Sequence, residues 1–202
     1  MALFQMGTPD IAVDIGTNNT RVYVKDKGIV VNEPSVVIVR NDNSKHIIAV
    51  GDSAEEMVME LSERKARAVA ERYKSELVLA ADTLVFGDEV LGKPKSPEHA
   101  IDMLGKLSGN WHSVFTGLTL IDTVTGTCIR RADQTRVHFV TMSAEDIAAY
   151  VATKEPLDKA GAYGIQGQGG MFIDRIEGSY SNVVGLPMAL LRSMLIEMND
   201  LI

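Results

Sequence analysis

The sequence changes character near residues 51–54, and this change constrains the fold more than any other feature. Residues 10–52 read as short strands separated by turn signals, with no helical pattern among them. After this stretch a helix is expected, followed by alternating strands and helices. We therefore expect an α/β protein with an all-strand N-terminal part, residues 1–53, and a second part, residues 54–202.

Periodicity and capping residues predict the elements of the second part. Ser53, Ser96 and Ser143 are good N-caps, and each precedes a stretch with helical spacing of apolar residues. Two alternating stretches joined through Thr125 and Gly126 predict a long hairpin with one solvated face. One helix is expected to begin at residue 53, and three more are expected over 96–107, 144–153 and 187–198. Strands are expected over 76–86, 112–121 and 128–140.

Lys65 is an unusual member of the first helix. It lies in the apolar stripe, four residues after Leu61 and four residues before Val69. A lysine on the inward face either packs its stem on the core while its ammonium group reaches water, or needs a partner. Both interpretations stay open at this point.

Asp82 is the most out-of-place acid in the chain. Together with Thr83 it interrupts the apolar run 76–86. Burying an unpaired carboxylate costs several kcal/mol, so we expect Asp82 at a strand end or facing a ligand. The alternative is a turn aspartate between two short strands.

Lys93 stands between Gly92 and Pro94 in a predicted turn. Glycine allows a close backbone approach and proline stiffens the exit of the turn. The turn either aims the Lys93 ammonium group at an anion or is a plain surface turn.

The segment 158–170 is rich in glycine and poor in large apolar residues. It holds five glycines together with Lys159, Tyr163 and Gln166. Such a loop exposes backbone N–H groups that can cradle an anion or read the edge of a base.

Composition excludes several kinds of partner. The chain has 20 basic and 27 acidic residues, which gives a net charge of −7 without a basic run. Nucleic acid and anionic membranes are therefore poor partners. The apolar stretches fall short of the roughly 20 residues that cross a bilayer, so we expect no stable membrane insertion. The single cysteine, Cys128, permits no internal disulfide and predicts a reducing, cytoplasmic location.

Common catalytic motifs are missing. The glycines of 158–170 do not match the dinucleotide fingerprint, and the sequence has no Walker A loop and no nucleophile elbow. The four histidines, at positions 46, 99, 112 and 138, are isolated and are interpreted as structural or exposed. The remaining candidates for catalysis are carboxylate side chains, which act as general bases or with a metal ion.

From residue 54 onward the chain resembles the Maf family of nucleoside triphosphate pyrophosphatases. The stretches that carry the resemblance are Glu-Leu-Ser-Glu-Arg-Lys-Ala at 60–66, Ala-Asp-Thr at 81–83, Leu-Gly-Lys-Pro at 91–94, Leu-Ser-Gly at 107–109, Thr-Gly at 116–117, Asp-Lys-Ala-Gly-Ala-Tyr-Gly-Ile-Gln-Gly at 158–167 and Asn-Val-Val-Gly-Leu-Pro at 182–187. The resemblance implies an elongated mixed sheet flanked by helices. It also implies cleavage of a nucleoside triphosphate between its α and β phosphates, with a divalent cation such as magnesium.

The resemblance also implies roles for individual residues. Asp82 matches the aspartate regarded as the catalytic proton acceptor, and a carboxylate can also hold the metal cation. Lys65 and Lys93 match the lysines that face the phosphates. Thr83 and Gln166 resemble the branch that prefers dTTP and UTP over 7-methyl-GTP, and a glutamine amide offers the donor and the acceptor that a pyrimidine edge requires. A homodimer is compatible with this interpretation.

The N-terminal part resembles the start of the actin-like cell-shape protein MreB. Residues 7–17, 22–24, 28–30 and 32–37 carry this resemblance, which includes an Asp-x-Gly-Thr turn at 14–17. Maf proteins instead open with a strand and a Ser-x-Ser-Pro-Arg-Arg loop, which this sequence lacks. We therefore expect reduced activity, and keep two alternatives: a filament-associated structural protein and a chimera without function. Ile11–Val13 replacing the first Maf strand is a further hypothesis.

Overall fold

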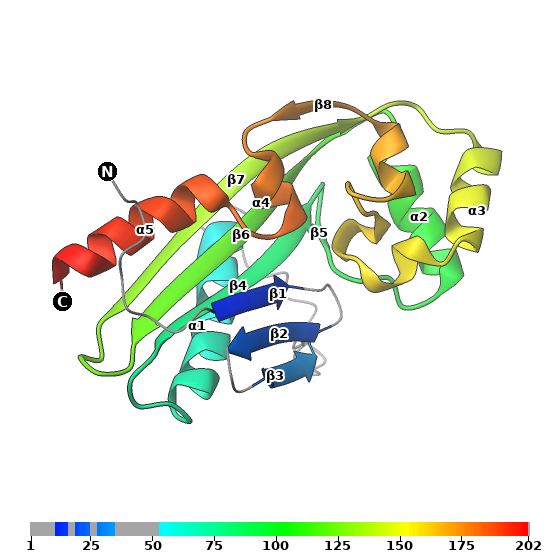
Figure 1. Ribbon diagram of the computed structural model, residues 1–202. Helices are drawn as coiled ribbons and strands as arrows, with labels where there is room; N and C mark the ends of the chain where they lie inside the picture. Colours follow the sequence, from blue (N-terminus) through cyan, green and yellow to red (C-terminus); the bar gives the residue numbers. More distant parts are fainter. Residues whose placement is uncertain (1–10, 16–18, 25–27, 35–52, 202) are drawn as a thin grey trace, which may run out of the picture.

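The computed structural model describes residues 11–15, 19–24, 28–34 and 53–201 of the chain. Three short N-terminal strands, β1 (Ile11–Ile15), β2 (Asn19–Val24) and β3 (Gly28–Pro34), form an antiparallel sheet in the order β1-β2-β3 (Figure 1). The short strands expected in 35–52 lie outside the described residues. The actin-like character of this part, and the hypothesis that β1 replaces a first Maf strand, stay predictions.

The second sheet has five strands in the order β5-β4-β6-β7-β8. Its strands are β4 (Leu77–Phe86), β5 (Val90–Leu91), β6 (Trp111–Asp122), β7 (Cys128–Phe139) and β8 (Ile173–Glu177). The β6–β7 hairpin turns through Gly126, whose φ of 76° is left-handed, so the predicted hairpin is confirmed.

Every strand pair in the described part of this sheet is antiparallel. The mixed sheet that the Maf resemblance implied is therefore wrong for the described residues. Tight links reverse the chain between β4 and β5 and between β6 and β7, and the longer connections that lead from β4 to β6 and from β7 to β8 also return the chain antiparallel.

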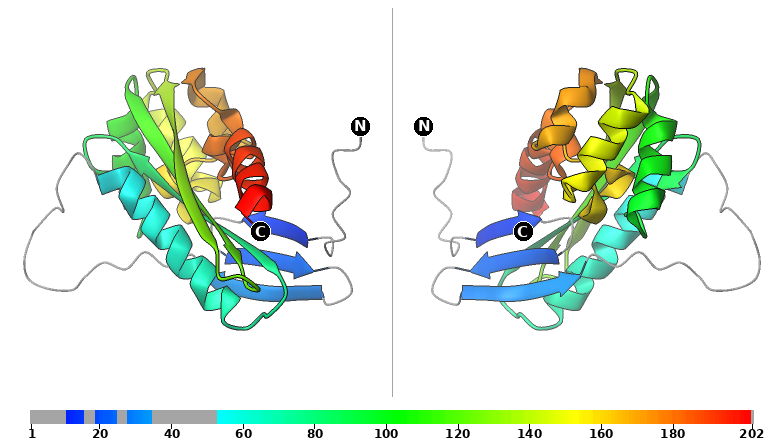
Figure 2. Two further views of the ribbon diagram at one scale, coloured as in Figure 1. Left: turned by 90° about the vertical axis from the view of Figure 1, so that its left-hand side faces the viewer. Right: turned by 90° about the vertical axis from the view of Figure 1, so that its right-hand side faces the viewer.

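Two helices cover opposite faces of the five-stranded sheet (Figure 2). Successive side chains of β4 point to opposite faces. On one face Ala80 packs with Ala66 of α1, and on the other Ala81 packs with Met194 and Met198 of α5. The helices are α1 (Ser53–Ala70), α2 (Pro97–Leu107), α3 (Ala144–Ala152), α4 (Tyr180–Val184) and α5 (Met188–Leu201).

The largest apolar core lies at one end of the sheet, beneath α2 and α3 (Figure 1). Three short 3₁₀ helices complete this end: η1 (Glu155–Asp158), η2 (Ala160–Ala162) and η3 (Gln168–Phe172). The predicted caps at Ser96 and Ser143 are confirmed, since Ser96 accepts a hydrogen bond from the N–H of His99 and Ser143 forms a capping box with Asp146, whereas Ser53 is itself the first residue of α1. The end of the molecule that holds the glycine-rich segment is thus built on well-capped helices.

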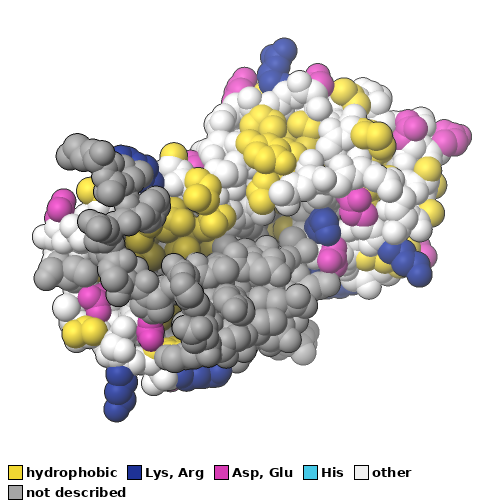
Figure 3. Space-filling view, viewed as in Figure 1, with side chains coloured by type: hydrophobic (Ala, Val, Ile, Leu, Met, Phe, Trp, Pro, Cys, Tyr) yellow, Lys and Arg dark blue, Asp and Glu magenta, His cyan; other side chains and the backbone are white. Residues whose placement is uncertain are grey.

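The surface view shows hydrophobic side chains gathered in a patch, with charged side chains scattered around it (Figure 3). Large apolar side chains exposed on α5 include Met188, Leu195 and Ile196. None of the described helices combines the length and hydropathy needed to cross a membrane.

Candidate active site

Asp82 lies in the middle of a continuous strand, β4, opposite Gly117 of β6. The expectation of a strand end and the alternative of a turn aspartate are both wrong, because hydrogen bonds to β6 run along the whole of β4. The Asp82 side chain keeps only 12% of its surface exposed. A carboxylate held this deep in a sheet needs a compensating charge.

Lys65 of α1 supplies that charge. Its ammonium group forms an ion pair with Oδ1 of Asp82 and also lies 3.4 Å from the carbonyl oxygen of Ala81. The interpretation of Lys65 as a stem that only reaches water is therefore wrong. Burial raises the pKa of Asp82 above its usual range, and the positive charges of Lys65, Arg64 and Lys93 oppose that rise. A carboxyl group with a raised pKa is a better proton acceptor than an exposed one.

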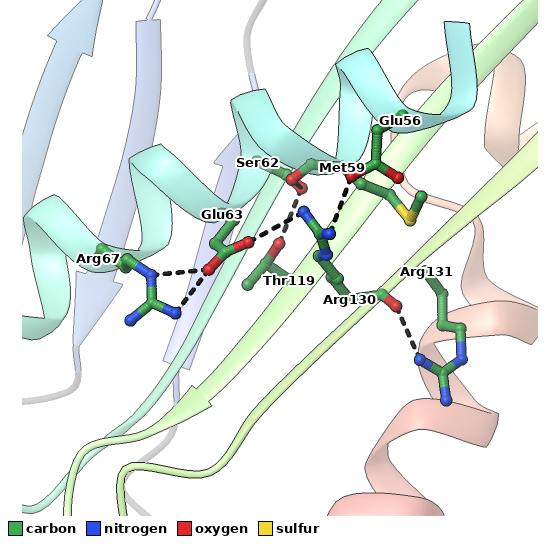
Figure 4. Close-up of polar contacts among 8 residues, drawn as sticks. All are labelled: Glu56, Met59, Ser62, Glu63, Arg67, Thr119, Arg130 and Arg131. Carbon is green, nitrogen blue, oxygen red and sulfur yellow. Dashed lines mark hydrogen bonds and ion pairs between the residues drawn. The ribbon is translucent and has the colours of Figure 1, made fainter. Parts of the chain in front are cut away.

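Polar contacts hold α1 against the sheet (Figure 4). The Ser62 hydroxyl lies 2.8 Å from the hydroxyl of Thr119 in β6. Arg130 of β7 pairs with Glu56 at 2.8 Å and with Glu63 at 3.1 Å. These bonds hold the part of α1 that precedes Lys65 against the sheet and so help to place Lys65 over Asp82.

Gly117 allows α1 to come this close. A Cβ atom at this position would overlap the carbonyl group of Val58 in α1. Because Gly117 is the register partner of Asp82, this close approach of helix and sheet lies next to the carboxylate. The Thr-Gly stretch that sequence comparison matched thus has a steric reason for its glycine.

Lys93 follows β5 and is half-buried. Burial lowers the pKa of Lys93; the charges of Asp158 and Asp82 raise it, whereas those of Lys65 and Lys159 lower it. Lys93 therefore lies within electrostatic reach of both Asp82 and Lys65. The structure thus joins Asp82 and Lys65 directly, with Lys93 as an electrostatic neighbour of the pair.

Thr83 lies on the opposite face of β4 from Asp82. Its hydroxyl is 2.9 Å from that of Thr116, which donates to the carbonyl oxygen of Asn182 at 3.0 Å. Asn182 is fully buried and donates to Val114 O and to Thr135 Oγ1, both at 3.0 Å. The structure therefore separates Thr83 from the charged cluster and links it to a polar chain centred on Asn182. The sequence showed Asn182 only as the start of a matched stretch.

Gln166 is exposed, in a turn that the N–H of Gly167 closes by donating to Gly164 O at 3.1 Å. The ion pair at the centre of the charged cluster joins Lys65 and Asp82 and does not include Gln166.

The glycine-rich segment binds an anionic group of the chain itself, the Glu155 carboxylate. The N–H groups of Gln168 and Gly169 donate to the Glu155 carboxylate at 3.0 and 3.1 Å. The prediction of exposed N–H groups that bind an anion is thus wrong for these two amides. Sequence reasoning missed Glu155, because nothing in the sequence links it to amides 13 and 14 residues away.

The histidines of the described part make internal contacts. His112 is buried, with Nε2 2.8 Å from the Tyr163 hydroxyl, and burial lowers its pKa to about 4. His138 pairs with Asp174 at 2.6 Å, and His99 Nδ1 accepts the N–H of Lys95. His46 lies outside the described residues. Within the described ranges no three His, Cys, Asp or Glu side chains gather to hold a metal ion.

Comparison with known proteins agrees with this geometry. The family described as Maf-like protein matches residues 27–198. The chain belongs to the Maf family. The match begins ahead of the predicted boundary at 53–54, so that boundary stays a prediction. The comparisons do not show the MreB-like N-terminus and give no support to the filament-associated alternative.

Several Maf relatives are similar over most of their length. A dTTP/UTP pyrophosphatase of Clostridium botulinum (strain Okra / Type B1) is 44% identical over 165 residues, which are 80% of this chain and 85% of the relative. One of Caldicellulosiruptor bescii is 47% identical over 148 residues, 71% of this chain and 74% of the relative. One of Clostridium novyi (strain NT) is 50% identical over 133 residues, 65% of this chain and 70% of the relative.

Proposed function

We propose that this chain hydrolyses dTTP and UTP to the nucleoside monophosphate and pyrophosphate. The observation that carries the proposal is the buried Asp82–Lys65 pair, with Lys93 in electrostatic reach. One carboxylate and two ammonium groups are the set needed to accept a proton from water and to balance charge on a triphosphate. The Maf relatives described above are dTTP/UTP pyrophosphatases, which supports the choice of nucleotide.

In the proposed reaction a water molecule attacks the anhydride between the α and β phosphates. The attacking water gives its proton to Asp82, through the Oδ2 oxygen that Lys65 leaves open. The bond to the bridging oxygen breaks, and pyrophosphate leaves with the electron pair. Lys65 and Lys93 stabilise the negative charge on the phosphates, which is largest in the transition state.

A magnesium ion fits this site only together with the substrate. Mg²⁺ is usually held by one or two carboxylates plus substrate phosphates, and the cluster offers the single carboxylate of Asp82. When bound, the ion would neutralise phosphate charge. Lys65 pairs with Oδ1 of Asp82, so the carboxylate has one open oxygen: Asp82 would either accept the proton of the attacking water or act as the protein ligand of the ion, which would then itself activate the water.

Nucleotide selection is assigned to Gln166, whose amide can donate to and accept from a pyrimidine edge. Thr83 belongs to this assignment only through the resemblance to the dTTP/UTP branch, since its hydroxyl faces Thr116 on the other face of β4. The missing Ser-x-Ser-Pro-Arg-Arg loop predicts a lower rate, because each lost bidentate arginine contact removes roughly 1.5–3 kcal/mol. A version of the chain that carries this loop should therefore be faster than the natural one.

The test is pyrophosphate release from a panel of nucleoside triphosphates, with magnesium present. Asp82→Asn keeps the size of the side chain but cannot accept the proton, so kcat should fall by about 10²–10⁴ with little change in KM. Asp88→Asn, in an exposed turn, is the matched control and should behave as the natural chain. Equal turnover by Asp82→Asn and the control would remove Asp82 from the mechanism.

A further inference from the structure

Glu155 is the centre of a hydrogen-bond network that holds the glycine-rich segment in shape. Its Oε1 accepts the Tyr150 hydroxyl at 2.8 Å and the N–H of Gly169 at 3.1 Å, and its Oε2 accepts the N–H of Gln168 at 3.0 Å. The Tyr150 oxygen in turn accepts the N–H of Gly164 at 3.1 Å. One acid and one phenol thus tie down both sides of the turn 164–167.

The backbone around Glu155 is itself fixed. Lys154, the residue before it, has a φ of 68°, and the buried Pro156 follows it. A non-glycine residue in the left-handed region persists only where the surrounding structure holds it there. The carboxylate is therefore presented from a rigid corner at the end of α3.

The turn closes directly against this carboxylate. A Cβ atom on Gly167 would overlap the Glu155 carboxylate, so the backbone next to Gln166 packs on it without any intervening side chain. Burial alone would raise the pKa of Glu155, but the N–H groups of Gln168 and Gly169 and the Tyr150 hydroxyl lower it below its usual range. The acid is thus ionised at neutral pH, and its bonds to the loop are charge-assisted.

We infer that Glu155 is a positioning residue for nucleotide selection, which holds the turn that presents the Gln166 amide. The inference rests on the proposed function, because it assigns base recognition to Gln166. Glu155 touches neither the base nor the phosphates in this scheme. Its effect on selection passes entirely through Gln166.

Glu155→Gln is the sharpest perturbation. Glutamine keeps the size of the side chain, and its oxygen can still accept from Tyr150 and Gly169. Its NH₂ group then faces the N–H of Gln168, donor against donor, so that one side of the turn is released. Glu145→Gln, on the exposed first turn of α3, is the matched control.

The readout is binding of α,β-methylene-UTP and α,β-methylene-GTP by titration calorimetry, because these probes report base preference without turnover. Glu155→Gln should lower the preference for the UTP analogue about tenfold, the effect of misplacing one hydrogen bond of about 1.4 kcal/mol. Gln166→Ala should lower it similarly, and the double variant should lose no more than either single variant. Glu145→Gln should keep the natural preference.

Three results would overturn the inference. The natural chain could bind both analogues equally, Glu155→Gln could leave the preference for the UTP analogue unchanged, or the effects of Glu155→Gln and Gln166→Ala could add in the double variant. If Glu155→Gln fails to fold by circular dichroism, Tyr150→Phe decides. This substitution removes the hydrogen bonds of Tyr150 to Glu155 and Gly164 but leaves those from the N–H groups of Gln168 and Gly169 to Glu155. The preference for the UTP analogue should therefore fall in the same direction. An unchanged preference refutes the positioning role of Glu155. Selective binding without pyrophosphate release would overturn the proposed function alone.

Discussion

Replacing Lys65 by methionine tests how strongly the ion pair with Asp82 stabilises the fold. Methionine keeps most of the aliphatic length of the lysine, so packing changes little and the charge is what is lost. Removing one partner of a buried pair costs about 3–5 kcal/mol. With side chains 20% and 12% exposed, we expect the lower end, about 3 kcal/mol at pH 7. In a domain of this size that lowers Tm by roughly 6–12 °C.

The pH dependence of this loss has a definite sign. Without Lys65 the pKa of Asp82 rises further, because burial is no longer opposed by the nearest positive charge. Above the new pKa the variant holds an uncompensated charge, whereas below it the carboxyl group is neutral and the penalty disappears. The gap in Tm between the natural chain and Lys65→Met should therefore shrink as pH falls.

The assay is thermal unfolding between pH 4 and pH 8 for the natural chain, Lys65→Met and the double variant Lys65→Met/Asp82→Asn. Neutral asparagine needs no counter-charge, so the double variant should recover much of the lost Tm at pH 7. Lys106→Met is the control, since Lys106 makes only exposed ion pairs with Glu89 and Asp102. The reasoning is refuted if Lys65→Met melts with the natural chain at pH 7, or if the double variant is no more stable than the single one.

Two further predictions concern packing and burial. Gly117→Ala should destabilise the chain by about 1–3 kcal/mol in urea unfolding, because the added methyl group meets the Val58 carbonyl. Gly105→Ala, which has open space around it, should not destabilise the chain. Equal effects of the two substitutions would contradict the close approach of α1 and the sheet. Burial lowers the pKa of His112 to about 4, so stability should fall as pH drops from about 6.5 toward 4, by about 3 kcal/mol in all. His112→Phe should flatten that slope, and an identical slope in both chains would count against a buried neutral imidazole.

The elements of the second part could be predicted from local signals. The serine caps, the helical spacing and the Thr125–Gly126 turn are encoded within a few residues, and the structure has the corresponding helices and hairpin. Asp82 and Lys65 also stood out, because a charge within an apolar pattern must be compensated. Their pairing could not be derived from the residues, since it depends on how α1 crosses the sheet.

What could not be predicted depends on contacts between distant segments. That Asp82 and Thr83 face opposite sides follows only once 76–86 is known to be one unbroken strand. The Glu155 network joins a helix end to a loop through backbone N–H groups, which carry no sequence signal. Whether neighbouring strands run parallel or antiparallel likewise depends on the path of the segments that connect them, and the sequence pattern does not define that path.

The internal anion of the glycine-rich segment also affects the thermodynamics of ligand recognition. A segment with so many glycines loses much conformational entropy when it becomes ordered. Because Glu155 orders it during folding, that entropic cost does not fall on the encounter with a ligand. A preorganised recognition segment of this kind should bind with a smaller unfavourable entropy than a glycine loop that closes only on its ligand.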